Sequence, residues 1–175
     1  METVIERDID AEIHLAIDNS GSMHEEKIEI AKKIAIVFSE AIKALDPHCS
    51  GRVWSFNSKV IYDLGKIPNA DAFVALKGSG GNSDTHMLKA VGSKLLRSTK
   101  RRKILFVLCD DGPDDMQLAK KMAEQLTARG VIVIHLLVGV HGTPDIYPIE
   151  LLYTNMEECL EEFGSLLQTI ISNLK

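Results

Sequence analysis

The sequence has few cysteines and no long apolar run, and both absences narrow its class. The three cysteines, Cys49, Cys109 and Cys159, are far apart and form no C-x-x-C pair, so neither a zinc ribbon nor a disulfide framework is indicated. No apolar stretch approaches the roughly 18 residues of a transmembrane helix. The first residues, METVIERDIDAE, carry acids where a signal peptide needs an apolar segment. These features predict a cytoplasmic protein.

An excess of positive charge is also missing. Lys and Arg number 20 against 25 Asp and Glu, which gives a formal net charge of −5. General binding to nucleic acid or to an anionic membrane rests on basic residues, so neither is expected as a partner. The exception is residues 97–103 (RSTKRRK), with five basic residues in seven, which we interpret as a solvated loop.

The length and the apolar pattern indicate one α/β domain. A chain of 175 residues fits a single domain, here 1–175, either complete or cut from a longer protein. Short apolar runs alternate with amphipathic stretches, which is typical of a parallel sheet covered by helices on both faces. We therefore predict a doubly wound, mostly parallel, six-stranded sheet with strands at 12–18, 52–56, 59–64, 103–109, 131–138 and 149–153.

The turn signals refine this prediction. Asn57 and Ser58 separate the second and third runs, which indicates a hairpin and therefore one antiparallel edge strand. Helical spacing of apolar residues covers 25–45, 87–95 and 156–174. A further helix is expected to start at Pro113, which suits a first helical turn, and to end at Gly130.

Polar residues that follow two of the predicted strands are the candidates for function. Parallel sheets bind ligands at the carboxyl ends of their strands. The first strand runs into Asp18, Ser20 and Ser22, whose oxygens recur at every second residue, and the fourth runs into Asp110 and Asp111. Hard oxygen ligands of this kind suit Mg²⁺ or Mn²⁺.

A third loop, Gly80-Gly81-Asn82-Ser83-Asp84-Thr85, adds hydroxyl groups just before a helix. With it the sequence resembles the von Willebrand factor A, or integrin I-like, family: a D-x-S-x-S turn, a GG-x-[ST]-D loop and a D-G pair after a buried strand, in that order. The resemblance extends from about residue 12 to 174, and it implies a Rossmann-like fold with a metal-ion-dependent adhesion site.

By position, the family's metal ligands correspond to Asp18, Ser20, Ser22, Ser83 and Asp111. The implied ion is Mg²⁺, or Mn²⁺ or Ca²⁺, and the implied function is binding to an Asp or Glu of a partner protein rather than catalysis. Two positions depart from the family pattern. Ser83 stands where threonine is commoner, with Thr85 as an alternative hydroxyl, and Asp110 stands where the family usually has Thr or Ser.

Two short stretches, SDTHMLKAVG and RRKILFVLCDDGPDD, resemble a particular intracellular subgroup of that family. They are similar to the carboxyl-terminal domains of the cobaltochelatase and nitric-oxide-reductase-activation groups. Those domains work beside AAA+ ATPases, so the resemblance implies an AAA+ assembly as a partner.

Other interpretations of these residues were weighed. FVLCDDGPDD also resembles a motif of haloacid-dehalogenase-like Mg²⁺-dependent phosphohydrolases, but that family needs D-x-D after the first strand, and here the second position is Ser20. The D-x-S-x-S residues alone would be explained by a turn that caps a helix, in a docking module without metal.

The histidines offer one more alternative. His24 and His86 flank the polar loops and, with the aspartates, could form a zinc site, although no H-x-x-x-H spacing supports it. His14 and His135 lie in predicted strands, and Cys109 ends an apolar run, so we expect all three in or near the core with the histidines satisfied.

Overall fold

The computed structural model describes residues 9–45, 47–66, 72–73, 76–139 and 145–173. Six strands form one sheet: β1 (Ala11–Asp18), β2 (Cys49–Phe56), β3 (Ile61–Gly65), β4 (Arg102–Cys109), β5 (Val131–Val138) and β6 (Ile149–Tyr153). The strand order is β3-β2-β1-β4-β5-β6, and only the β2–β3 pair is antiparallel. The predicted fold class, including the antiparallel edge strand, is confirmed.

The centre of the sheet lies at β1, which pairs in parallel with β2 on one side and with β4 on the other. The chain leaves β1 toward β2 and later returns to β4, so the strand order reverses at this point. Open α/β sheets bind ligands outside the carboxyl ends of the strands at such a switch point. The residues after β1 and β4 are therefore the first place to look for a site.

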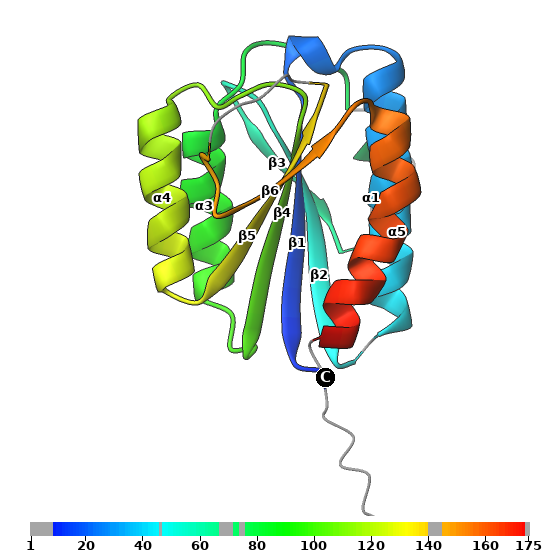
Figure 1. Ribbon diagram of the computed structural model, residues 1–175, viewed down its shortest axis with the longest axis vertical. Coiled ribbons are helices and arrows are strands. Elements are labelled where there is room, and N and C mark those ends of the chain that lie inside the picture. Colours follow the sequence, from blue (N-terminus) through cyan, green and yellow to red (C-terminus); the bar gives the residue numbers. More distant parts are fainter. Residues whose placement is uncertain (1–8, 46, 67–71, 74–75, 140–144, 174–175) are drawn as a thin grey trace, which may run out of the picture.

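Helices cover both faces of the sheet (Figure 1). On one face α1 (Glu26–Ala44) packs against α5 (Met156–Asn173), and on the other α3 (Asp84–Leu96) packs against α4 (Met116–Ala128). A 3₁₀ turn, η1 (Gly21–Met23), connects β1 to α1. This arrangement is the doubly wound, three-layer architecture that the alternating sequence pattern predicted.

Alternation along the strands divides the core in two. In β4 the side chains of Ile104, Phe106 and Leu108 pack under α1 and α5, whereas Leu105, Val107 and Cys109 face α3 and α4. Successive strand residues point to opposite faces, so a strand buried on both faces must be apolar throughout. This explains the continuous apolar runs in β4 and β5.

The start of α4 differs from the prediction. The helix begins at Met116 rather than at Pro113, and its N-cap is Asp115, whose carboxylate accepts a hydrogen bond of 2.9 Å from the backbone N–H of Leu118. Asp is a strong capping residue, and its side chain sets the start of the helix three residues after the proline. The predicted end is confirmed, because Gly130 follows the helix with φ +90°.

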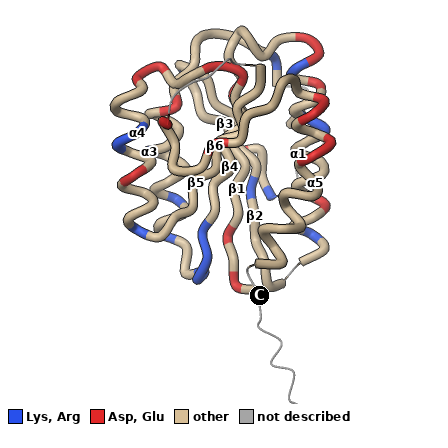
Figure 2. The backbone as a smooth tube through the Cα atoms, viewed as in Figure 1, with Lys and Arg blue, Asp and Glu red and all other residues tan. Residues whose placement is uncertain are grey.

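Charge is distributed unevenly along the strand direction. In Figure 2 acidic residues occupy several loops at the upper end of the view, where β1 and β4 end, while the lower end carries basic residues where β4 begins and acidic residues where β1 begins. Within the described residues, no helix is both long enough and apolar enough to cross a bilayer.

Candidate metal centre at the carboxyl edge of the sheet

Three polar loops meet above β1 and β4, and backbone hydrogen bonds hold them together. The N–H of Gly21 donates to the carbonyl of Gly80 at 2.8 Å, and the N–H of Ser79 donates to the carbonyl of Asn19 at 3.0 Å. The side-chain amide of Asn82 donates to the carbonyl of Gly112 at 3.1 Å. The loops after β1, before α3 and after β4 are therefore fixed relative to one another.

Asp18 is the last residue of β1, and its side chain is fully buried. The backbone N–H of Ser20 donates to one carboxylate oxygen at 2.7 Å, and the Ser20 hydroxyl donates to the other at 3.0 Å. Burial raises the pKa of Asp18 to about 7; the hydrogen bonds from Ser20 lower it, and the carboxylates of Asp84 and Asp110 raise it further. This position concentrates negative charge in a poorly solvated place.

The cluster continues from Ser20 to the loop after β4. The hydroxyl oxygens of Ser20 and Ser22 are 3.0 Å apart, and the Ser22 hydroxyl donates to Asp110 Oδ1 at 2.7 Å. Lys27, in the first turns of α1, donates from Nζ to Asp110 Oδ2 at 2.6 Å. We call Asp18, Ser20, Ser22 and Asp110 the oxygen cluster.

The other predicted ligands lie differently. Ser83 and Thr85 both have their hydroxyls 3.4 Å from Asp114 Oδ2. Asp111 is exposed, and its carboxylate accepts a hydrogen bond of 2.7 Å from the N–H of Gly112. The structure thus links Asp110, rather than Asp111, to the serine hydroxyls by a hydrogen bond, while cation binding by Asp111 and Ser83 stays a prediction.

The two exposed histidines beside these loops have ordinary surroundings. His24 Nδ1 lies 2.7 Å from the carbonyl oxygen of Gly21, and His86 lies on the exposed side of α3. Among the described residues, the group that could hold a metal through nitrogen or sulfur is instead Asp84, Cys109 and His135, all buried. Sequence reasoning missed this group because it assigned Cys109 and His135 to the core.

The histidines within the strands differ from each other. His14 is satisfied as expected, because Trp54 donates to its Nδ1 at 3.1 Å and Glu12 Oε1 lies 2.8 Å from its Nε2. His135 is buried, but neither of its ring nitrogens has a hydrogen-bond partner among the described residues. The expectation of a satisfied His135 was therefore wrong.

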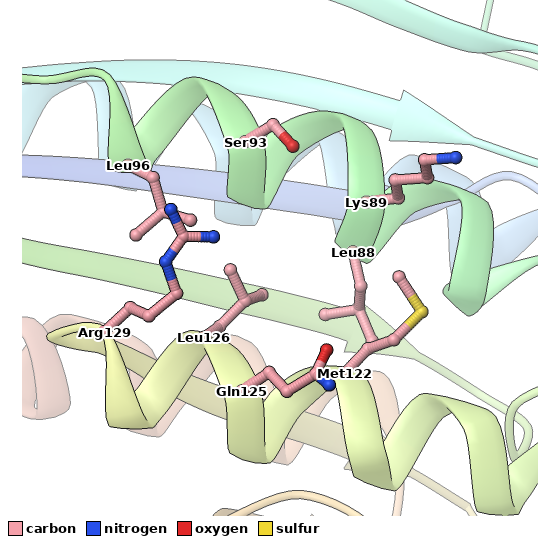
Figure 3. A pocket seen from close by; sticks show the side chains of 8 residues that line it. All are labelled: Leu88, Lys89, Ser93, Leu96, Met122, Gln125, Leu126 and Arg129. Carbon is pink, nitrogen blue, oxygen red and sulfur yellow. The ribbon is translucent and has the colours of Figure 1, made fainter.

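Two surface pockets lie near the helices. Side chains of α3 and α4 line one of about 160 Å³, in which Leu88, Met122 and Leu126 point toward one another (Figure 3). The other, of about 230 Å³, is bordered by Lys27 and Ile30 of α1 and by Asn155 and Met156 before and at the start of α5. Lys27, which borders the second pocket, also contacts Asp110 of the oxygen cluster.

Solved structures with the same fold include proteins of bacterial pili. The chain superposes on the pilus adhesin SpaC from Lactobacillus rhamnosus GG with a TM-score of 0.77 and 14% identity, over 94% of this chain and 31% of that one. It superposes on the von Willebrand factor domain of the pilus tip protein Mfa5 from Porphyromonas gingivalis with a TM-score of 0.75 and 11% identity, over 95% and 97%. The chain has a von Willebrand A-type fold.

Another neighbour in fold carries a metal. Proximal thread matrix protein 1 from the mussel byssus, with a zinc-occupied metal-ion-dependent adhesion site, superposes with a TM-score of 0.73 and 11% identity, over 93% of this chain and 46% of that one. The present chain spans about a third of SpaC and under half of the byssus protein. No protein-family model and no curated protein sequence matches the chain.

Proposed function

We propose that this von Willebrand A-type domain is a protein-interaction module that depends on a divalent cation held at the oxygen cluster. The observation that carries the proposal is the series of close oxygen contacts Asp18–Ser20–Ser22–Asp110, which joins the loops after β1 and β4 at the switch point of the sheet. A turn that only caps a helix would not need this series. Ser20 makes no side-chain capping bond to η1, and the residue before α1 is Glu25, which makes none either.

The donors fit a hard cation. All four side chains offer oxygen, and two of them are carboxylates, with Lys27 as the only positive side chain bonded to them among the described residues. Oxygen donors of this kind suit Mg²⁺, Mn²⁺ or Ca²⁺. A bound cation would supply an electrophilic coordination position for a carboxylate from outside.

The protein's own groups hold these donors in place. The backbone N–H of Ser20 fixes the orientation of the Asp18 carboxylate. The hydroxyl hydrogens of Ser20 and Ser22 can rotate, so each oxygen can turn a lone pair toward a cation. We place Asp110 in the cluster. Ser83, Thr85 and Asp111 remain predicted ligands, and cation titration of variants at these positions tests them.

The partner we propose is a protein that presents an Asp or Glu side chain. A carboxylate on the cation would add a charge-assisted contact, and the surrounding loops would add shape complementarity. Support comes from the neighbours in fold, two of which are named as a pilus adhesin and a pilus tip protein. An AAA+ assembly as the partner is suggested by the sequence resemblance alone.

No described residue favours the dehalogenase-like alternative. Ser20, which replaces the second aspartate of that family, donates its hydroxyl to Asp18 and offers no acid to protonate a leaving group. We therefore propose binding without catalysis.

Calorimetric titration with Mg²⁺ and Mn²⁺ tests the proposal on the wild-type chain and on Asp18→Ala. We expect binding to the wild type and none to the variant, with the fold retained because Asp18 lies at a strand end and outside both apolar clusters. Asp63→Ala, at an exposed ion pair with Arg52, is the matched control and should bind normally. Equal affinity in wild type and Asp18→Ala, with both folded by circular dichroism, would rule out the oxygen cluster as the site.

A further inference from the structure

A second group of possible ligands lies inside the domain, beneath α3 and α4. Asp84 is the first residue of α3, Cys109 is the last residue of β4, and His135 lies in the middle of β5. Each offers one ligand atom, and these atoms all lie within 4.8 Å of one another. The exposed fractions of the three residues are 0%, 0% and 1%, so bulk water does not reach them.

The group contains buried polar atoms without a hydrogen-bond partner in the described part of the chain. Asp84 Oδ1 and both ring nitrogens of His135 lack a hydrogen-bond partner among the described residues. Leaving one buried polar group unpaired costs about 1–3 kcal/mol, and native proteins contain few of them. Because a carboxylate oxygen of Glu150 lies 3.5 Å from His135 Nδ1, the atoms left for a bound group are Asp84 Oδ1 and His135 Nε2.

Neighbouring side chains orient these atoms. Tyr147 donates its hydroxyl to Asp84 Oδ2, which leaves Oδ1 for another partner. Glu150 Oε1 lies 3.5 Å from His135 Nδ1, which leaves Nε2 as the nitrogen available for binding. Metal-binding histidines commonly direct their second nitrogen at a carboxylate in this way, because it fixes the orientation and the tautomer of the ring.

We propose that Asp84, Cys109 and His135 form a buried zinc site with three protein ligands inside the domain. A carboxylate, a thiolate and a neutral imidazole are all ordinary zinc ligands, and the first two balance the charge of Zn²⁺. Burial raises the pKa values of both Asp84 and Cys109, although the hydrogen bond from Tyr147 acts in the opposite direction on Asp84. The sulfur and nitrogen donors separate this site from the oxygen cluster, which suits harder ions.

The site would couple zinc to the position of the functional loops. Its ligands come from α3, β4 and β5, so they meet only in the folded chain, and binding energy of this kind contributes to folding. Asp84 follows Ser83 in the sequence, and Cys109 precedes Asp110. Zinc would thus fix the ends of two loops at the carboxyl edge, and the inference stands whether or not the oxygen cluster binds a cation.

Refolding with Co²⁺, a spectroscopic substitute for Zn²⁺, tests the proposal. The full chain is unfolded in denaturant with a chelator, refolded with Co²⁺ and freed of excess ion. We expect one tightly held ion per chain and a sulfur-to-cobalt charge-transfer band in the near ultraviolet. The band should disappear in Cys109→Ser and persist in Cys49→Ser and Cys159→Ser, whose cysteines are also buried but lie outside the group.

Two further measurements cover the remaining outcomes. If Cys109→Ser fails to fold, X-ray absorption at the zinc edge of the wild type decides: one sulfur neighbour at about 2.3 Å is expected, and a shell of oxygen and nitrogen alone overturns the proposal. In Asp18→Ala the cobalt–sulfur band should remain, so failure of the oxygen cluster and failure of the zinc site are distinguishable. A wild type that retains neither zinc nor cobalt after refolding also overturns it.

Discussion

The hydroxyl of Ser22 donates to Asp110 Oδ1 at 2.7 Å, across a separation of 88 residues in the sequence. This bond connects the loop after β1 with the loop after β4 and places one carboxylate of the adjacent pair at the serines. Asp111, the next residue, is exposed, and within the described ranges its carboxylate bonds only to the backbone N–H of Gly112. The two aspartates therefore have different hydrogen-bond partners, and we expect them to contribute differently to cation binding.

The first prediction compares these two aspartates. Asp110→Asn should weaken Mg²⁺ or Mn²⁺ binding at least tenfold, about 1.4 kcal/mol, because it removes the negative charge of a carboxylate that is hydrogen-bonded to Ser22. Asp111→Asn should change the affinity less. Calorimetric titration of both variants measures the difference. The reverse order of effects would assign the carboxylate to Asp111, as the sequence motif does.

Lys27 is expected to oppose cation binding, since its ammonium lies 2.6 Å from Asp110 Oδ2. Lys27→Met removes a positive charge within several ångströms of the cluster, and at the effective dielectric constant of a protein surface this should raise cation affinity severalfold. Lys32→Met, which breaks a pair with Glu29 on the same helix, is the matched control. Weaker binding in Lys27→Met would show that the lysine supports the site by positioning Asp110.

The glycine-rich loop before α3 supplies a steric test. A Cβ on Gly78 would lie 2.8 Å from the backbone N of His24 and from the carbonyl oxygen of Ser20, so Gly78→Ala must displace the loop that carries the serines. A Cβ on Gly81 would meet only Ser58, at 3.5 Å. We expect Gly78→Ala to lose most cation affinity and Gly81→Ala to keep it. Equal titration curves would mean that the loop after β1 can shift without any loss of cation affinity.

Much of this architecture could be predicted from the sequence, because its strongest signals are local. The continuous apolar run of β4 predicts a strand buried on both faces, and the structure places it next to β1 in the middle of the sheet. Asp18, Ser20 and Ser22 follow a strand directly, so their meeting in one cluster depends on only a few residues of chain. The short strand β6 was also predicted with the bounds that it has.

The sequence could not predict the contacts between segments that are far apart in the chain. The choice between Asp110 and Asp111 depends on the direction of the chain after β4, whereas the D-G motif pointed to Asp111. The partners of His135 depend on residues that are distant in the sequence. His135 pairs in the sheet with Val107, and Val107 lies two residues before Cys109 on the face of the sheet that α3 covers. Only strand register and the docking of α3 bring Asp84 to them.

A pH test follows from Glu12, at the opposite end of β1. The indole of Trp54 can only donate, so His14 Nδ1 accepts its hydrogen bond and Nε2 carries the proton that is donated to Glu12. The hydrogen bond from His14 lowers the pKa of Glu12 from 4.5 to about 2, with support from Ser50 and Ser98 and against the opposing effect of burial. The carboxylate form is therefore favoured in the folded chain.

The sign of the pH dependence follows from this depressed pKa. The contribution of Glu12 is below about 3 kcal/mol, because solvent screens a carboxylate that is only half-buried; it is present above pH 4.5 and is lost as the pH falls toward about 2. Urea unfolding should show wild type more stable than Glu12→Gln at pH 6 and a shrinking difference between about pH 4.5 and 2. Glu40→Gln, an exposed glutamate of α1, should show no such trend. A constant difference across that range would contradict the assigned pKa.

The last prediction concerns the basic run at the start of β4. Arg101 and Arg102 are exposed and lie where β4 begins, whereas Asp110 follows the end of that strand. Eight strand residues at about 3.3 Å each put roughly 25 Å between the two groups. The Debye length at physiological ionic strength is about 8 Å, so solvent and salt screen charges at that separation. Replacing both arginines by glutamine should therefore leave Mg²⁺ and Mn²⁺ affinity within about twofold of wild type, in contrast to Lys27→Met. A shift of more than about tenfold, or 1.4 kcal/mol, could not come from screened charges across the sheet, and the cation would then have to bind elsewhere than at the oxygen cluster.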